Sequence, residues 1–300
     1  MKYIITYIIV LLMLGYTCQL KAQADMSHSK TQQTPQQPAN KNTTQILTNL
    51  DESITYNKIQ KADLKYQHLK QFPRQLLQCV NIEEIDLAYN EITEIPEQIA
   101  QLKYLRRIYL NNNQLQTLPE SIFELKNLEI LFIQNNKKGF RLSPKIAQFQ
   151  QLTYLFASDL EELPNAVWQL NHLQKLRIWR SNVLQIPDEI ANLSQLEEIC
   201  FRENHITQIS PKIYQLQQLN YFSFGDNHLT QILPDINQLH NLNYIAIFGN
   251  DIQQLLIDPQ QLTKLDILSC WNTKLDSNQL NQINTRFPKL KVYTSNETIH

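Results

Sequence analysis

Residues 105–127 read LRRIYLNNNQLQTLPESIFELKN, and this stretch decides the fold. Its apolar residues stand at fixed positions, and the same positions are apolar in the stretches that begin at Ile82 and Leu128. These starts are 23 residues apart, while the residues between the fixed positions change. One such unit cannot bury its apolar side alone. The repetition therefore predicts a solenoid in which each unit stacks on its neighbours.

The first half of the unit has the pattern of a strand. Ile108 and Leu110 alternate with their neighbours at the period of two that strands show. Asn113 ends the strand, and its amide carries donors and an acceptor for the backbone of adjoining units. Since every unit returns the chain in the same direction, the strands should form one parallel sheet.

The second half predicts a turn and a short helix. Leu118-Pro119 turns the chain, because proline fixes φ and has no N–H to donate. Ile122 and Leu125 are three residues apart, which places both on the inner side of one helical turn.

The pattern L-x-x-L-x-L-x-x-N-x-L-x-x-L-P-x-x-I-x-x-L is met almost fully in the units that start at 82, 105, 196, 219 and 242. It resembles the leucine-rich repeat superfamily, in its bacterial form of about 23 residues. The resemblance implies an α/β solenoid: a right-handed horseshoe with a concave parallel sheet, short turns or helices on the convex side and an N-terminal capping helix. It says little about function, because the superfamily serves many.

Ten units are expected over residues 59–288, followed by an edge strand and tail at 289–300. They start at Ile59, Ile82, Leu105, Leu128, Leu152, Leu173, Leu196, Leu219, Leu242 and Leu265. The unit from Leu128 has 24 residues, whereas the unit from Leu152 has 21 and no asparagine at the end of its strand. We expect a local kink or change of curvature over residues 157–181.

The N-terminal segment predicts export. Residues 1–24 combine Lys2, an apolar run and a small-residue cleavage site, as a signal peptide does. A lipoprotein signal acylated at Cys18 stays open as an alternative, although the residues before Cys18 match its motif poorly. The protein would then be periplasmic, outer-membrane-associated or secreted, and would meet a membrane only if lipidated.

Two segments connect this signal to the repeats. Residues 25–44 are rich in Gln, Pro and Asn and predict a disordered tether. Residues 45–58 carry apolar residues at helical spacing and predict an amphipathic helix that covers the open end of the first unit.

Charge and cysteines limit the possible classes. The net charge of −1 argues against a phosphate-binding nucleic-acid protein. Removal of residues 1–24 would leave three cysteines, Cys79, Cys200 and Cys270, which is no disulfide framework. The sequence contains no Gly-rich phosphate loop, H-E-x-x-H, C-x-x-C or G-x-S-x-G motif, so we expect neither an enzyme nor a cofactor.

The residues beside the strand leucines face the concave side, and they are not uniform. Aromatic and apolar residues gather in the third to sixth units, with basic residues around them, a composition typical of interface hot spots. The alternative is that these rings only stack on one another across the sheet. The predicted concave patch consists of Arg107, Tyr109, Ile130, Phe132, Tyr154, Phe156, Lys175, Arg177, Trp179 and Arg180.

Two further groups are weaker candidates. A secondary patch contains Tyr221, Tyr244, Phe248 and Trp271. His205, His228 and Asp251 occupy one position in successive units, and strand spacing would permit a metal site there. The alternative is a solvated rim of variable residues.

These observations predict a monomeric, non-catalytic module that binds a protein or peptide on its concave face. Burial of a rigid aromatic patch with flanking positive charge would supply the affinity, since little ordering entropy is lost. A second hypothesis is carbohydrate or cell-wall binding through the same patch.

Overall fold

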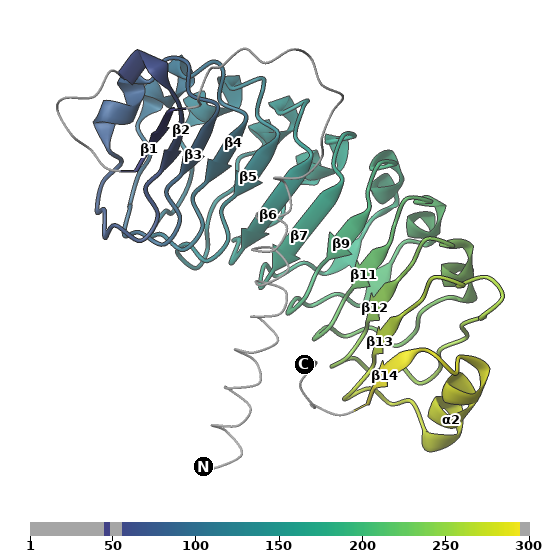
Figure 1. Cartoon of the computed structure of the whole chain (residues 1–300). Helices are drawn as coiled ribbons and strands as arrows, with labels where there is room; N and C mark the ends of the chain where they lie inside the picture. Colours follow the sequence, from purple (N-terminus) through teal and green to yellow (C-terminus); the bar gives the residue numbers. More distant parts are fainter. Residues whose placement is uncertain (1–44, 49–55, 295–300) are drawn as a thin grey trace, which may run out of the picture. The chain divides into compact units, whose positions relative to one another are not determined.

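The structure is a computed structural model that describes residues 45–48 and 56–294. The described residues up to Val292 belong to one compact unit. Twelve of their strands form a single parallel sheet in chain order (Figure 1). These strands are β1 (Gln45–Leu47), β2 (Ile59–Asp63), β3 (Glu84–Asp86), β4 (Arg107–Tyr109), β5 (Ile130–Phe132), β6 (Tyr154–Ser158), β7 (Lys175–Trp179), β9 (Glu198–Cys200), β11 (Tyr221–Ser223), β12 (Tyr244–Ala246), β13 (Ile267–Ser269) and β14 (Lys291–Tyr293).

The register repeats the unit. Tyr109 lies beside Asp86 in β3 and beside Phe132 in β5, one unit away on either side. The apolar residues at the fixed positions, such as Ile108 and Leu131, are fully buried between the sheet and the outer turns. The predicted solenoid and its parallel sheet are therefore confirmed.

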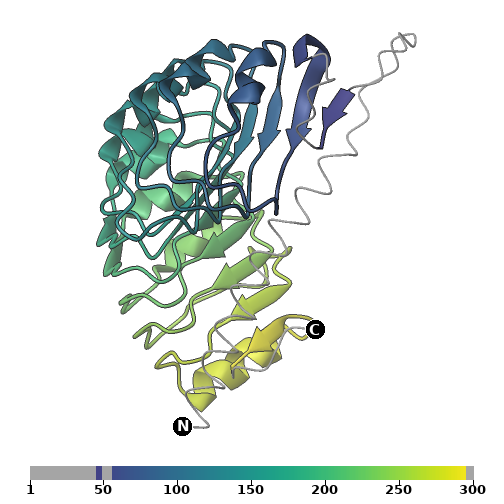
Figure 2. The same ribbon diagram turned by 90° about the vertical axis from the view of Figure 1, so that its left-hand side faces the viewer.

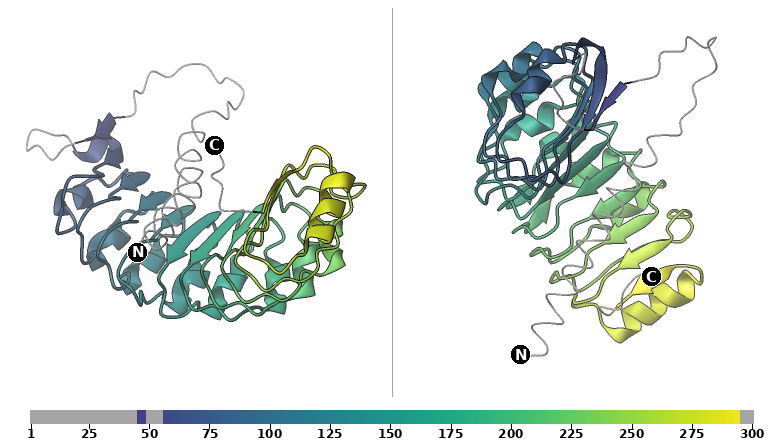
Figure 3. Two further views of the ribbon diagram at one scale, coloured as in Figure 1. Left: turned by 90° about the horizontal axis from the view of Figure 1, so that it is seen from below. Right: turned by 60° about the vertical axis from the view of Figure 1, so that its left-hand side comes forward.

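Short 3-10 turns lie on the other side of this core. Most begin directly after a proline, as η4 does after Pro119, and each is closed by a backbone bond such as Leu125 N–H to the Ile122 carbonyl, 3.0 Å long. In the left view of Figure 3, the sheet lines the inner face of this unit and the turns line its outer face. The turns are η1 (Tyr56–Lys58), η2 (Arg74–Gln78), η3 (Glu97–Gln101), η4 (Glu120–Glu124), η5 (Pro144–Gln148), η6 (Asn165–Gln169), η7 (Asp188–Asn192), η8 (Pro211–Gln215) and η9 (Pro234–Gln238).

The two ends of the stack differ. The capping helix predicted for 45–58 is wrong where the structure describes it: Gln45–Leu47 form β1, which adds to the sheet beside β2, and Tyr56–Lys58 form a 3-10 turn. Backbone pairing covers this end where we expected an apolar helix face. At the other end, the helix α2 (Ser277–Arg286) closes the stack (Figure 2), and the Asp276 carboxylate accepts the N–H of Gln279 at its N-terminus.

Buried asparagines tie the strand ends together. The Asn113 amide donates to the carbonyls of Leu87 and Leu110, while its oxygen accepts the N–H of Ile92. Asn90, Asn136, Asn204, Asn227 and Asn250 repeat this role.

The ladder is interrupted at Leu160, as the sequence predicts. There the Asp159 carbonyl accepts the N–H groups of Gly139 and Phe140, and the Glu161 N–H donates to the Phe140 carbonyl. The extra residue of the 24-residue unit thus supplies backbone donors to the short unit. Strands β6 and β7 lengthen to five residues across this point, and the sheet continues through it (Figure 1). The change of curvature stays a prediction.

A second, small sheet lies on the flank of the middle units. It pairs β8 (Gln185–Ile186) with β10 (Gln208–Ile209) in parallel. The tether at 25–44 and the signal peptide at 1–24 lie outside the described residues.

Candidate functional site

A ladder of aromatic rings crosses the concave side of β4 to β7. The edge of the Tyr109 ring meets Phe132 at a centroid distance of 5.0 Å, and Phe132 stacks on Phe156 at 4.2 Å. The Arg177 guanidinium covers the far face of Phe156, 4.6 Å from the ring centre. The sheet register brings these residues together, because they hold one position in four consecutive units.

Most of this predicted patch is covered. Tyr109, Phe132, Phe156 and Trp179 each expose less than a tenth of their surface, whereas Ile130 and Tyr154 are half-buried. The sequence-based expectation of a broad exposed apolar surface is therefore corrected. Each ring lies against its neighbour, which is the cross-strand stacking that the sequence left as the alternative.

The basic residues around the rings are already paired with acids. Arg107 donates to Glu84 at 2.7 Å, Lys175 lies 3.8 Å from Glu198, and the Arg177 Nε donates to the same Glu198 carboxylate. Two acids compensate only part of the positive charge around the rings, because Lys61 and Arg107 share Glu84 while Lys175 and Arg177 share Glu198. Sequence reasoning missed Glu84 and Glu198 as part of the site. They occupy the same position of their units as Arg107 and Lys175, so they could have been found there.

Arg177 differs from the rim residue that the sequence predicted. Its side chain is fully buried between the Phe156 ring and Glu198, which is itself buried. A buried charge needs a partner of opposite sign, so this pair holds one conformation of the sheet centre. Arg177 lies beside Phe156 at the end of the aromatic ladder and does not contact solvent.

The position that Arg107 and Lys175 occupy in their units carries charges of alternating sign in the first three units, as Lys61, Glu84 and Arg107. Lys61 and Arg107 both contact the Glu84 carboxylate, at 2.5 and 2.7 Å. Burial raises the pKa of Glu84, but the hydrogen bonds and charges of its two partners outweigh it and hold that pKa below its ordinary value. Glu84 is therefore ionised at neutral pH.

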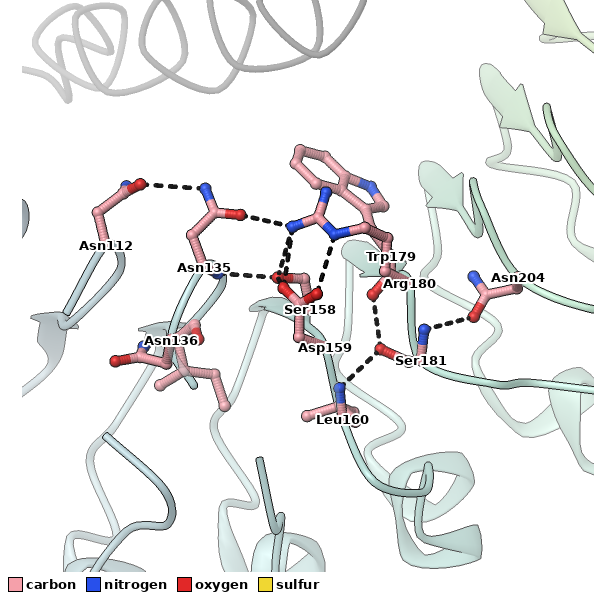
Figure 4. A network of polar contacts seen from close by, with 11 residues as sticks. Asn112, Asn135, Asn136, Ser158, Asp159, Leu160, Trp179, Arg180, Ser181 and Asn204 are labelled. Atoms are coloured by element: carbon pink, nitrogen blue, oxygen red, sulfur yellow. Dashed lines mark hydrogen bonds and ion pairs between the residues drawn. The ribbon is translucent and has the colours of Figure 1, made fainter. Parts of the chain in front are cut away.

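Arg180 organises the rim beside this ladder (Figure 4). Its guanidinium donates to both oxygens of Asp159 at 2.9 Å and to Asn135 at 2.8 Å, while Asn135 donates to Asn112 at 3.1 Å. The hydrogen bonds to Asp159 raise the pKa of Arg180. Arg180 stands in the left-handed region with φ of 46°, where a long side chain costs about 1–2 kcal/mol. The network offsets this cost.

The secondary patch divides into two ring stacks. Tyr221 stacks on Tyr244 at 4.3 Å, and Phe248 stacks on Trp271 at 4.6 Å. The Arg202 guanidinium lies 4.9 Å from the centre of the Phe248 ring. Only Tyr244 among the four rings is half-buried, and the others are buried.

The histidine row does not assemble a metal site in the described part of the chain. His205 and His228 stack, with the Nδ1 of one 3.4 Å from the Nε2 of the other. Asp251 pairs instead with Lys274 at 2.7 Å. Across 45–48 and 56–294, no three His, Cys, Asp or Glu side chains gather as ligands for an ion.

The three described cysteines are free and buried. Burial raises the pKa of Cys79 to about 11 and that of Cys270 to about 12. Such thiols stay protonated at neutral pH and react poorly. Cys200 lies beside Arg177 in the sheet and accepts a hydrogen bond from the Trp179 indole at 3.3 Å.

A parallel sheet, buried asparagines and proline-led turns, repeated every 23 residues, define a solenoid of leucine-rich repeats. The family model described as "Leucine-rich repeat region" matches residues 63–180 and 160–292. The chain belongs to this family. No curated protein matches the sequence significantly.

Solved structures show the same fold. The internalin InlF of Listeria monocytogenes is 17% identical with a TM-score of 0.61, over 79% of this chain and 74% of that one. The ectodomain of the Arabidopsis thaliana receptor kinase GASSHO1/SCHENGEN3 is 20% identical with a TM-score of 0.64, over 78% and 29%. The ectodomain of the Arabidopsis receptor kinase HAESA is 24% identical with a TM-score of 0.62, over 71% and 38%. The chain thus spans less than half of either plant receptor. None of the described helices has the length and apolar character needed to cross a membrane.

Proposed function

We propose that this protein recognises a protein or peptide ligand through the concave face of β4 to β7, without catalysis. The main observation behind this proposal is the row of packed rings formed by Tyr109, Phe132 and Phe156. The buried Arg177–Glu198 pair lies against its last ring. Side chains fixed in this way lose little freedom when a ligand binds.

The partly exposed residues of the patch make the contact in this proposal. Ile130, Tyr154, Arg107 and Lys175 are half-buried on the concave side, so an extended segment would lie across them. The rings beneath would hold them in place. HAESA, which shares the fold, has been solved with a peptide hormone ligand, and the plant peptide hormone receptor RGFR1 has been solved in complex with RGF2. These likenesses support a peptide as the ligand class.

The charges around the rings define the expected ligand further. Lys61 and Arg107 share Glu84, and Lys175 and Arg177 share Glu198, so these side chains keep a net positive charge. The ligand segment should be mainly apolar with some acidic residues, and its affinity should fall between about 50 mM and about 500 mM salt. Saccharide stacking on the concave ladder is less favoured, since Phe132 and Phe156 stack on each other and the three rings of the ladder are buried.

The test is affinity capture, followed by a binding measurement with the purified partner. Tyr154→Ala and Ile130→Ala should weaken binding at least about tenfold, equal to 1.4 kcal/mol. Leu184→Ser, which changes an exposed apolar residue outside the strands, is the matched control and should bind as the parent does. Equal affinity of all four proteins for that partner would disprove the concave site.

Export by residues 1–24 is part of the same proposal. Sequencing the N-terminus of the protein from its native host should find Asp25 first. An acylated Cys18 at that terminus would favour the lipoprotein alternative, and an intact Met1 would contradict both.

A further inference from the structure

One edge of the sheet carries an open groove, separate from the concave patch. It lies at the N-terminal ends of β3 to β5 and encloses about 750 Å³. Tyr104, Arg106, Asn127, Glu129, Gln150 and Gln151 line it, together with Glu83 and Lys126. We propose that this groove binds an uncharged oligosaccharide, with Tyr104 as its stacking platform.

Tyr104 is an exception that the fold does not require. Residue 104 directly precedes the first apolar position of its unit, where the other units from Ile82 onward carry polar residues: Asn81, Asn127, Gln151, His172, Gln195, Gln218, Asn241 and Lys264. Tyr104 exposes 61% of its surface, more than a large apolar or aromatic residue usually does in a repeat.

The asparagines at this position show what the fold gains from a short amide. Asn81 and Asn127 each donate a hydrogen bond of 2.8 Å to a backbone carbonyl of the preceding unit, and Asn241 does the same. A tyrosine ring has no amide to donate. Tyr104 therefore forgoes a stabilising bond between units and exposes an aromatic surface, which points to a ligand.

The rest of the groove supplies planar hydrogen-bonding groups. The Arg106 Nε donates to Glu129 at 2.9 Å, so a guanidinium and a carboxylate are held side by side. The amide of Asn127 is fixed by its bond to the Lys103 carbonyl, which orients its oxygen. Such groups bond hydroxyls as donors and acceptors at once, while a tyrosine ring packs on an apolar sugar face.

The floor of the groove is rigid backbone. Arg106 N–H donates to the Glu83 carbonyl at 2.9 Å and Glu129 N–H donates to the Arg106 carbonyl at 2.7 Å. The lining residues come from three consecutive units, which spans about 10 Å at the spacing of parallel strands. A groove of this length and volume accommodates linked sugar rings.

Charge selects an uncharged ligand. Glu83 and Glu129 carry negative charge, and Arg106 and Lys126 carry positive charge, so the groove sums to zero. An acidic polysaccharide would meet Glu83 and Glu129, and a cationic peptide would meet Arg106 and Lys126. Neither gains a net attraction.

The test measures binding of cellotetraose, chitotetraose, maltotetraose and mannotetraose to the purified protein by NMR titration. At least one of them should bind with a dissociation constant of about 1 mM or tighter. Tyr104→Asn should weaken it at least about tenfold, whereas Tyr104→Phe should keep it within about threefold. Tyr104→Asn inserts the residue that positions 81 and 127 already carry, so it should fold at least as well as the parent.

Three results would overturn the inference. They are binding weaker than about 1 mM for all four sugars, equal binding by Tyr104→Asn, or loss of a protein partner in that variant, which would make the edge a protein contact. Tyr154→Ala separates this site from the concave proposal, because it should leave sugar binding unchanged.

Discussion

The ring of Phe248 lies directly over Gly225, so that a β-carbon at residue 225 would come within 2.4 Å of the nearest ring atom. Phe248 can meet Arg202, two units away, because Gly225 in the unit between them carries no side chain. Gly225 thus decides how the secondary patch is arranged.

Gly225→Ala should lower the free energy of unfolding by about 1–3 kcal/mol, because the ring must move or the strand must shift. Urea unfolding followed by circular dichroism measures the change. In a Phe248→Leu background the same substitution should cost less, since the ring is gone. An equal cost in both backgrounds would show that the ring is not the cause.

Glu198→Gln should destabilise the protein by about 3–5 kcal/mol, because the buried Arg177 would lose the carboxylate that compensates its charge. The double variant Arg177→Leu with Glu198→Leu should recover most of this loss, since it removes both charges. Thermal unfolding compares the three proteins. Full stability of Glu198→Gln would mean that the pair contributes little to the sheet centre.

Leu160→Asn restores the family residue in the ladder and yet should destabilise the protein by about 2–4 kcal/mol. The backbone donors near this site already reach the Asp159 and Phe140 carbonyls, so a buried amide would find few partners. Asn113→Ala is the comparison and should also lose stability, because it removes several buried hydrogen bonds. If Leu160→Asn stabilised the protein, backbone hydrogen bonds would not be what replaces the missing asparagine at this site.

Asp226→Asn should change how stability depends on pH. Burial raises the pKa of Asp226 to about 6, although the charge of Arg202 opposes the shift. Since the folded state holds the proton more tightly than the unfolded state, Asp226 lowers stability as pH rises from about 4 to above 6. The variant should therefore be more stable than the parent at pH of about 7.5, by about 1–3 kcal/mol, and equal to it below pH of about 4. Unfolding across this range measures the difference, and a constant offset at all pH values would disprove the titration.

Much of the fold could be predicted from the sequence because the period of 23 fixes strand, turn and register together. The ladder gap at Leu160 and the irregular units were visible as departures in length. The strand at Gln45–Leu47 could not be predicted from helical spacing alone, because its pairing with β2 is a long-range contact that outweighs local preference.

The site was predicted less well than the fold. The repeat pattern gives Tyr109, Phe132 and Phe156 the same position in successive units and so places them side by side, as the register confirms. How far those rings cover one another, and which acids meet Arg107 and Arg177, depend on side-chain conformations that a repeat pattern does not specify. Tyr104 was overlooked because it does not lie on the concave side of a strand. The sequence does carry a signal for it, because the same position holds an asparagine at Asn81 and Asn127.

The bonds from the N–H groups of Gly139 and Phe140 to the Asp159 carbonyl join the 24-residue and 21-residue units into one structural module. A regular unit, such as the one from Leu105 to Asn127, could be duplicated or excised and leave matching backbone junctions on both sides. Residues 128–172 can be transplanted or lost only together, because either half alone would present a neighbour with unmatched backbone groups. At this one place, the smallest segment that can be moved or removed is therefore two repeats long.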